Sequence, residues 1–532
     1  MLKINTLTLH GNTYACSKVN LIIGANNSGK STLLRVLHNG VTNQVSQETE
    51  PRVNVNLSMS RGKTLISTLF PDVYTATSFK DIANLGLKTT KIQNIQNVPW
   101  SEQMLTTLKT DTDDEKNLLI NPGQPAGTNQ YFQFFTNMLV SLEDSASRLQ
   151  MPYRTKIDNL NSIPQDVIGH LFRDKDILAL IRKNVEDTFG FSIGFDNLVQ
   201  GEKPLRIMPK AKSNLKPDTV VSAQWWEKNS ALIESQGDGI RAYMKIILSL
   251  LQPYKHIIFI DEPETFLHPP QRRALGTIIA QLANKGDKQV FLATHDPDIL
   301  RGILNSKLSD ISMFHLMREN DQFSSKIIEP DKINKIIKSS SNLLAEKLLS
   351  SFFYQIAILC EDENDRVFYE NSSAIYFWQL FQNVNFIGFN GRGKAMQMFE
   401  YLKSLSLDAR LVVDIDILID SGLPNNVTDT QIKFDYTALK SKLNTLVKSD
   451  PKFRERFKKK GVPYFKTSNP TIYTELTTII ALLQKNGVYV VPVGELESWT
   501  KIKKNDLTSA LEIVEKTKLI KLRGFLRNLL TK

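Results

Sequence analysis

The segment GANNSGKS at residues 24–31 constrains this chain more than any other feature of its sequence. It follows the apolar run LII and opens STLLRVLH, which predicts a buried strand, a glycine-rich turn and a helix in succession. Such a turn lets backbone N–H groups surround a phosphate, and the helix N-terminus adds the positive end of its dipole. The segment therefore predicts a nucleotide-phosphate site. A turn that only connects a strand to a helix is the alternative, and this context disfavours it.

Two side chains of this turn have distinct chemistry. Lys30 can reach the β- and γ-phosphates of a nucleotide, and the hydroxyl of Ser31 can ligate Mg²⁺. The other contacts are expected from residues that wrap the phosphates. The expected cofactor-binding residues of the turn are Gly24, Asn26, Asn27, Ser28, Gly29, Lys30, Ser31 and Thr32.

A second apolar run, HIIFI, leads into two adjacent acids, Asp261 and Glu262. Asp261 at the end of the predicted strand is placed to hold the water shell of Mg²⁺, and Glu262 is placed to polarise the attacking water. Adjacent carboxylates after a strand can also do no more than cap a helix. The phosphate turn upstream favours the catalytic interpretation, so Asp261 is a predicted metal ligand and Glu262 a predicted catalytic residue.

Two further motifs complete a set that resembles the ABC ATPase class. VFLATHDPDIL is a strand pattern ending at His295, and SQGDGIR at residues 235–241 opens a helix upstream of Asp261. The resemblance implies that His295 contacts the γ-phosphate and that Ser235 and Gly237 bind the γ-phosphate of a nucleotide held by another subunit. The loop departs from the transporter form LSGGQ. Such composite sites imply a homodimer or a higher homo-oligomer.

The class also has a glutamine loop, for which Gln44 and Gln47 are equal candidates. No run of about 18 apolar residues and no signal-peptide pattern is present, so we expect a cytoplasmic protein without a membrane partner. The two cysteines, Cys16 and Cys360, lie in apolar runs and are expected to be free thiols.

Acids also follow the predicted strands of the C-terminal part of the chain. In a parallel sheet such strand ends meet at one edge, where α/β sites form. Clustered carboxylates repel one another unless a cation is present, and their oxygens suit Mg²⁺ or Mn²⁺. A solvated acidic rim is the alternative. The expected metal ligands of this edge are Glu361, Asp365, Asp414, Asp416 and Glu497.

This arrangement resembles the TOPRIM domain, and an ABC ATPase followed by TOPRIM resembles the OLD (overcoming lysogenization defect) family of nucleases. The resemblance matches Glu361 with Asp365 to a Glu-Gly-x-x-Asp element and Asp414 with Asp416 to a D-x-D element. It implies that Glu361, Asp414 and Asp416 are catalytic, and it matches Glu497 to the acid after the last strand.

The chain departs from the OLD pattern at one position and leaves another open. The glycine after the first glutamate is Asp362 here, which puts cleavage in doubt. For the basic residue that this family places near the scissile phosphate, Lys503 and Lys504 are candidates.

The expected fold class is α/β in two parts. An ABC-type P-loop ATPase head spans residues 1–345, with a mostly helical insertion at about 95–215 that could serve dimerisation, and a Rossmann-like TOPRIM domain spans 346–532. The serine-rich stretch at residues 338–342 is the expected linker.

The charge of the chain favours a polyanion as partner. Its net charge is +11, and the run PKFRERFKKK at residues 451–460 holds six basic residues and one acid. This run is either a solvated helical face or a track for the DNA backbone.

Together these patterns predict an ATP-controlled, metal-dependent DNA endonuclease that uses ATP with Mg²⁺, and Mg²⁺ or Mn²⁺ at the second site, in defence against phage. A sensor or scaffold ATPase that binds without cutting, and acts through a second defence protein or a regulatory RNA or DNA, is the first alternative. A DNA-organising ATPase is the second, but the sequence lacks the sustained heptads of coiled-coil arms.

Overall fold

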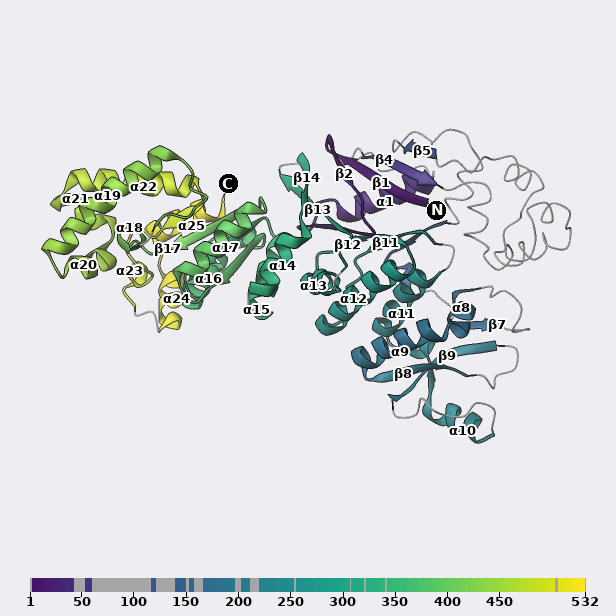
Figure 1. The fold of residues 1–532 in the computed structure, drawn as a ribbon. Coiled ribbons are helices and arrows are strands. Elements are labelled where there is room, and N and C mark those ends of the chain that lie inside the picture. Colours follow the sequence, from purple (N-terminus) through teal and green to yellow (C-terminus); the bar gives the residue numbers. More distant parts are fainter. Residues whose placement is uncertain are drawn as a thin grey trace. The chain divides into compact units, whose positions relative to one another are not determined.

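A computed structural model (Figure 1) describes most of the chain as two compact units, Met1–Lys335 and Ile336–Lys532. Each unit has its own sheet and core. The described residues are 2–42, 53–59, 116–120, 139–149, 153–156, 166–196, 202–210, 220–252, 255–306, 308–319, 322–339, 342–420, 422–502 and 506–531.

The first unit is built on a mostly parallel sheet in the order β14-β13-β3-β12-β11-β6. Its neighbouring strands pair in parallel, apart from β13 with β14. The parallel order brings the carboxyl ends of β3, β11, β12 and β6 to one edge. The strands are β3 (Val19–Gly24), β6 (Val140–Glu143), β11 (Ile257–Asp261), β12 (Gln289–Ala293), β13 (Ile311–Glu319) and β14 (Gln322–Ile328).

Four helices accompany this sheet, and local caps fix where several of them begin. Asp296 caps the helix that follows β12, accepting hydrogen bonds from the N–H groups of Asp298 and Ile299. A proline opens the helix that follows β11, where its missing N–H costs nothing. The helices are α1 (Lys30–Thr42), α11 (Asp238–Leu251), α12 (Pro269–Lys285) and α13 (Pro297–Asn305).

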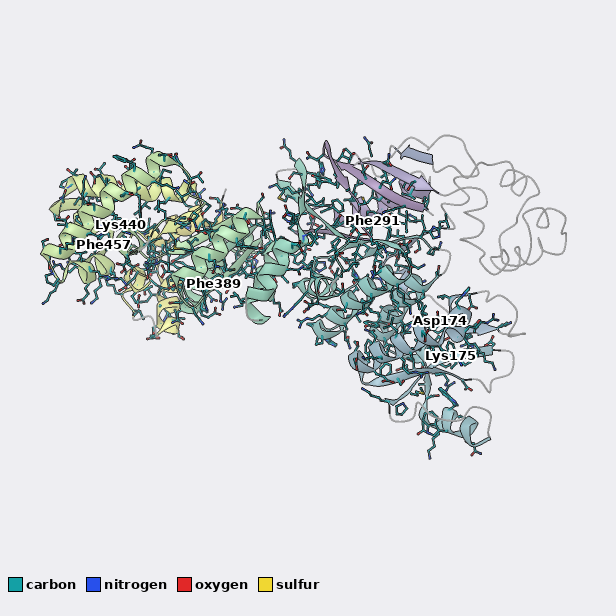
Figure 2. The ribbon with its side chains drawn as sticks, in the orientation of Figure 1. Asp174, Lys175, Phe291, Phe389, Lys440 and Phe457 are labelled. Carbon is teal, nitrogen blue, oxygen red and sulfur yellow. The ribbon has the colours of Figure 1, made fainter. Side chains whose placement is uncertain are left out.

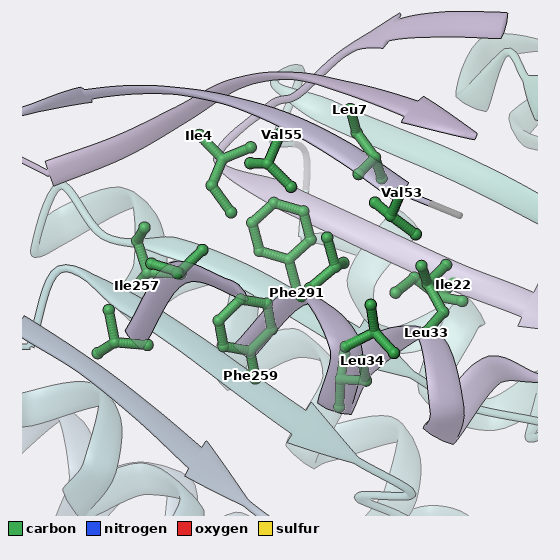
Figure 3. Close-up of a cluster of buried hydrophobic side chains, with 14 of the residues drawn as sticks. Ile4, Leu7, Ile22, Leu33, Leu34, Val53, Val55, Ile257, Phe259 and Phe291 are labelled. Carbon is green, nitrogen blue, oxygen red and sulfur yellow. The ribbon is translucent and has the colours of Figure 1, made fainter. Parts of the chain in front are cut away.

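An antiparallel sheet in the order β2-β1-β4-β5 covers part of the same core. Figure 3 shows Ile4 and Val55 from this sheet beside Phe291, which stacks on Phe259 at a centroid distance of 5.2 Å. Leu34 of α1 lies in the same buried cluster. The strands are β1 (Leu2–Leu9), β2 (Asn12–Ala15), β4 (Val53–Met59) and β5 (Lys116–Ile120).

The segment at about 95–215 was expected to be mostly helical. Its described part contains both helices and strands, which corrects that expectation. Within this segment, α9 (Lys175–Phe189) is helical as expected. Residues 140–143, expected to be helical, instead form β6, because parallel pairing with β11 places them in the core sheet. The described elements between β6 and α11 are α8 (Val167–Arg173), α9, α10 (Val220–Asn229), β7 (Arg154–Lys156), β8 (Phe191–Phe195), β9 (Glu202–Pro209), β10 (Ala231–Leu232) and the short turns η1 (Ser147–Leu149) and η3 (Ile233–Ser235).

The second unit has a fully parallel sheet in the order β16-β15-β17-β18. The strands are β15 (Ile356–Cys360), β16 (Val384–Gly388), β17 (Ala409–Val413) and β18 (Val488–Val490). Helices of this unit cover the sheet and build the region between β17 and β18. They are α15 (Asn342–Ser350), η4 (Ser351–Phe353), α16 (Glu363–Phe381), α17 (Arg392–Ser404), α18 (Ile417–Asp420), α19 (Thr430–Ser449), α20 (Phe453–Lys460), η5 (Val462–Tyr464), α21 (Phe465–Ser468), α22 (Pro470–Lys485), α23 (Glu497–Thr500), α24 (Leu507–Lys516) and α25 (Ile520–Leu530).

The basic run expected at residues 451–460 forms α20, whose apolar face is buried. Phe457, labelled in Figure 2, is fully buried and stacks on Phe453 at 5.8 Å between ring centroids. The boundary between the two units falls within α14 (Pro330–Ser339), just before the serine-rich stretch expected as a linker. Within the described ranges, no helix is both long and apolar enough to cross a membrane. Cys16 and Cys360 are both free thiols.

Candidate functional site

The phosphate turn follows β3 and has the backbone conformation that its glycines permit. Gly24 has a φ of +152°, and a Cβ there would lie 2.3 Å from the carbonyl oxygen of Leu316. Gly29 also has a positive φ, of +86°, and α1 begins at the next residue. These positions need glycine because side chains would clash or strain the backbone. The turn therefore keeps its backbone open for an anion at the start of α1.

Lys30 lies folded over this turn and is buried. Its Nζ donates to the carbonyl oxygens of Gly24 and Ala25 at 3.0 and 2.9 Å. Burial lowers the pKa of Lys30 from its ordinary value, and the nearby charges of Glu264 and Glu262 oppose that change. A phosphate has oxygens that can replace the two carbonyls as acceptors for this ammonium group.

Two predicted magnesium ligands meet beside the turn. The hydroxyl of Ser31 donates to Oδ1 of Asp261 at 2.9 Å. Burial raises the pKa of Asp261, the Ser31 hydrogen bond opposes this, and the charge of Glu262 adds to it. A hydroxyl and a carboxylate held in contact match the donor set through which Mg²⁺ binds with nucleotide phosphates, so these residues fit that ion.

His295 lies close to Glu262 and to a third acid, Glu264, which the sequence motifs did not single out. Nδ1 of His295 is 3.6 Å from Oε1 of Glu262 and 3.1 Å from Oε1 of Glu264. Glu264 is buried, and it accepts hydrogen bonds from the Thr294 hydroxyl at 2.9 Å and from the His295 N–H at 3.0 Å. Burial raises the pKa of Glu264, and the charge of His295 opposes that change. Glu264 therefore positions the residue expected to contact the γ-phosphate.

The end of β6 adds side chains that sequence reasoning missed. Because β6 pairs in parallel with β11, Glu143 lies opposite Ile260 at the same edge as Asp261. Beyond it, Arg148 is fully buried and its Nη1 donates to the carbonyl oxygen of Glu262 at 2.7 Å. The apolar pattern of this segment indicated a helix and hid the strand end. The candidates for a glutamine loop, Gln44 and Gln47, lie outside the described residues.

Ser235 and Gly237 lie in the loop that opens α11. The Ser235 hydroxyl donates to the Leu232 carbonyl oxygen at 2.7 Å, and Gly237 is the N-cap of the helix. In the part of the chain that the structure describes, no hydrogen bond or ion pair joins either residue to the phosphate turn. A role in a subunit's own phosphate site therefore has no support from these contacts.

The second unit brings three of its predicted acids to one edge of its sheet. Oε1 of Glu361, just after β15, accepts from Nε of Arg392 at 2.8 Å and from the N–H of Asp414 at 3.1 Å. Arg392 also pairs with Asp416. Burial alone would lower the pKa of Arg392, but its hydrogen bond to Glu361 and the charges of both acids raise it.

A lysine from the basic run completes this array. Nζ of Lys458, on α20, lies 2.6 Å from Oδ2 of Asp416. Burial alone would lower the pKa of Lys458, but the hydrogen bond and charge of Asp416 raise it above its ordinary value. The candidates Lys503 and Lys504 lie outside the described residues. We call Glu361, Arg392, Asp416 and Lys458 the charged array.

The remaining predicted ligands of this unit lie in the first turns of two helices. Asp362 caps α16 and accepts from the N–H of Asp365 at 2.9 Å, with an extended backbone that any residue can adopt. Asp365 is buried in that turn, and Glu497 begins α23. Across the described residues, no group of three or more Asp, Glu, His or Cys side chains is close enough to hold a metal ion.

The fold and the first site together define a P-loop ATPase-type α/β unit. A family model described as an AAA domain, putative AbiEii toxin, Type IV TA system, matches residues 151–301. An ATP/GTP phosphatase of Helicobacter pylori is 24% identical over 352 residues, which are 58% of this chain and 88% of that protein. The Old nuclease of Escherichia phage P2 is 24% identical over 258 residues, 46% of this chain and 43% of the nuclease, so the chain matches less than half of that relative.

Solved structures of two kinds of ATPase also align with the chain. An SMC head bound to the C-winged helix domain of ScpA covers 62% of this chain and 99% of its own, at 12% identity and a TM-score of 0.36. The protein cbiO1 from Clostridium perfringens, part of the ABC transporter complex cbiONQ, covers 63% of this chain and 94% of its own, at 12% identity and a TM-score of 0.28. These likenesses are too distant to add to the fold described above.

Proposed function

We propose that this protein is an ATP-controlled, divalent-metal-dependent DNA endonuclease that acts in defence against phage. The observation that carries the proposal is the charged array, in which carboxylates from the ends of two strands lie against Arg392 and Lys458. It occurs in a chain whose other unit has a P-loop site. The similarity to the Old nuclease of phage P2 supports the same conclusion.

In the first unit the residues suit ATP hydrolysis. Lys30 offsets phosphate charge, Ser31 and Asp261 would hold Mg²⁺, and Glu262 polarises the attacking water. His295, held by Glu264, faces the γ-phosphate. Ser235 and Gly237 serve the nucleotide of a second subunit, which makes a homodimer the smallest active assembly.

In the second unit Glu361, Asp414 and Asp416 are the carboxylates that would hold Mg²⁺ or Mn²⁺ once Arg392, which pairs with Glu361 and Asp416, moves aside, because among the described residues they are not grouped closely enough to hold an ion as they stand. When bound, such a cation lowers the pKa of its water and stabilises charge on the leaving oxygen. Arg392 and Lys458 bind the non-bridging oxygens of the phosphodiester and orient it against the carboxylates. Lys458 takes the role of the basic residue near the scissile phosphate, for which the sequence offered only Lys503 and Lys504.

The alternative is a sensor or scaffold ATPase whose second unit binds nucleic acid without cutting it. One observation favours it, because Arg392 stands between Glu361 and Asp416 where a cation would neutralise them. The presence of Asp362 does not favour the sensor or scaffold, since its backbone is extended and its side chain caps α16. The departure from glycine at this position is therefore compatible with an intact strand end.

Plasmid cleavage decides between the two. Purified protein is incubated with supercoiled plasmid and Mg²⁺ or Mn²⁺, with and without ATP, and a Lys458→Ala variant runs beside Lys442→Ala as a matched control. Lys442 pairs with Glu475 on the exposed surface of α19. We expect cutting by the wild type and the control, and a loss of about 100-fold or more in Lys458→Ala. No cutting under any of these conditions would favour the sensor.

A further inference from the structure

Two arginines connect the water-activating Glu262 with the helix that Ser235 and Gly237 open. Arg148 donates to the Glu262 carbonyl oxygen at 2.7 Å. The next residue, Leu149, offers its own carbonyl oxygen to Nη2 of Arg241 in the first turn of α11. One short turn, η1, is thus bonded to the catalytic loop on one side and to α11 on the other.

Glu262 has a backbone conformation that needs support. Its φ is +49°, in the left-handed region, which is unfavourable for a residue with a side chain. The N–H of Glu262 donates to the Ala293 carbonyl oxygen at 2.9 Å, which fixes one side of the residue. Its carbonyl oxygen accepts from Arg148 and from the Thr265 hydroxyl, at 3.0 Å for the latter, which fixes the other. The Thr265 N–H donates to the same oxygen at 3.1 Å, so the loop holds this carbonyl group from within and Arg148 holds it from another element.

Holding one carbonyl group with a fully buried arginine costs free energy, because the charged side chain is removed from water. Arg148 has no exposed surface, and its Nε and Nη2 have no hydrogen-bond partner in the described structure. Burial lowers the pKa of Arg148, and the carboxylates of Glu264, Asp261 and Glu143 oppose that change. A residue that only filled this space would be apolar, because a buried N–H without a hydrogen-bond partner is destabilising.

At the α11 end of this connection, Arg241 and the first turn of the helix are also held by direct contacts. Arg241 pairs with Asp238 at 3.2 Å, and its own carbonyl oxygen accepts from the Tyr153 hydroxyl at 2.8 Å. A Cβ at Gly239 would lie 2.7 Å from the Phe266 carbonyl oxygen, so the first turn of α11 packs on the loop that follows Glu262. A shift of α11 therefore moves groups that contact both ends of this loop.

We propose that Arg148 is a positioning residue that sets the direction of Glu262 and that, through Leu149 and Arg241, ties it to the position of α11. The inference rests on the proposed ATP hydrolysis. It implies that engagement of the Ser235 loop by a second subunit's nucleotide acts on water activation in the same subunit, and not on nucleotide binding.

The test separates turnover from binding in the full-length protein. Arg148→Met and Arg241→Gln are compared with the wild type for kcat and KM of ATP hydrolysis, and for the Kd of a fluorescent ATP analogue. We expect kcat to fall about 10- to 100-fold in Arg148→Met and about 3- to 10-fold in Arg241→Gln, with KM and Kd within about threefold of wild type. The double variant should lose no more than Arg148→Met alone, because both substitutions break one connection.

Control variants distinguish the possible outcomes of this test. Arg182→Gln removes an arginine that likewise donates to a backbone carbonyl, that of Ile193 at 2.9 Å, away from the loop, and it should hydrolyse ATP normally. If Arg148→Met does not fold, the half-exposed Arg241 still decides the question. Normal kcat in Arg241→Gln, or equal losses in kcat and nucleotide affinity, would overturn the inference. A wild type without ATP turnover above Lys30→Ala would instead contradict the proposed function.

Discussion

At the residue scale, the phosphate site is held ready by contacts that a nucleotide can exchange. Lys30 bonds to the carbonyl oxygens of Gly24 and Ala25, and Ser31 bonds to Asp261. Phosphate oxygens can replace the two carbonyl oxygens as acceptors for Lys30, and Mg²⁺ can replace the Ser31 hydroxyl as the partner of Asp261. Binding and hydrolysis then depend on different residues.

Substitutions should separate these two steps. Lys30→Ala removes the ammonium that offsets phosphate charge and should weaken ATP binding about 100-fold or more. Glu262→Gln keeps the volume of the side chain and should bind ATP normally while hydrolysing it at least about 100-fold more slowly. Isothermal titration and a phosphate-release assay measure the two quantities. Wild-type turnover in Glu262→Gln would remove Glu262 from water activation.

Sequence motifs predict the site residues that lie within one local segment of the chain. They do not predict the residues that distant segments bring to the site. Lys30, Ser31 and Asp261 follow from local strand–turn patterns that chemistry requires at that spacing. Arg148, Arg392 and Lys458 reach their partners from other elements, so only the packed structure shows them. Lys458 in particular looked like one charge among several in a basic run.

At the element scale, strand order explains where sequence patterns succeeded and failed. The strands expected before Asp261 and His295 are present as β11 and β12, since continuous apolar runs are typical of buried parallel strands. β6 lies within the segment at about 95–215 that was expected to be mostly helical. Pairing with β11 overrides that local pattern, and it could not be foreseen without the sheet order.

The contact between α12 and α13 offers a test of packing in the first unit. A Cβ at Gly302 would lie 2.1 Å from the Arg273 carbonyl oxygen, so the helices meet backbone to backbone. Gly302→Ala should lower the free energy of unfolding by about 1–3 kcal/mol, although alanine favours a helix, because the helices must separate. Thermal melts compare it with Gly524→Ala in α25, where nothing lies within 4 Å of the new Cβ. Equal stability of the two variants would contradict the close approach.

The basic helix α20 divides its lysines between the charged array and the surface. Lys459 is exposed and pairs with Glu455, and Lys460 lies over the Tyr464 ring at 5.9 Å. Lys459→Glu with Lys460→Glu should weaken DNA binding and reduce the slope of log affinity against log salt by about 2, because each lysine releases counterions from the backbone. Binding by fluorescence anisotropy at several salt concentrations measures this, with Lys516→Glu on α24 as control. An unchanged slope would make α20 a solvated face.

At the scale of the whole molecule, we propose that the loop of Ser235 acts on the nucleotide of a second subunit. It engages Leu232 and Gln236 and opens α11 in its own chain. We predict that mixing Lys30→Ala with Ser235→Arg protein restores ATP hydrolysis to roughly a quarter of wild type, because half the dimers are mixed and each has one intact composite site. Titration of one variant into the other measures the rescue. No recovery at any ratio would contradict a site shared between subunits.

The two proposed chemistries belong to separate units, each with its own core. The ATP site uses Lys30, Asp261 and Glu262, while the charged array uses residues that follow β15 and β17 and residues of α17 and α20. Within the described residues, the hydrogen bonds of the Glu361 carboxylate go to Arg392 and Asp414, both in its own unit. We therefore propose that ATP hydrolysis controls cutting and that cutting occurs at the charged array.

The most direct test of this claim is plasmid cleavage and ATP hydrolysis measured on the same preparations of wild type, Glu361→Ala, Asp414→Ala and Lys30→Ala. We expect Glu361→Ala and Asp414→Ala to lose cutting by about 100-fold or more while ATP hydrolysis stays within about twofold of wild type. Lys30→Ala should lose hydrolysis and, with it, the response of cutting to ATP. Cutting that survives in both Glu361→Ala and Asp414→Ala would contradict the account.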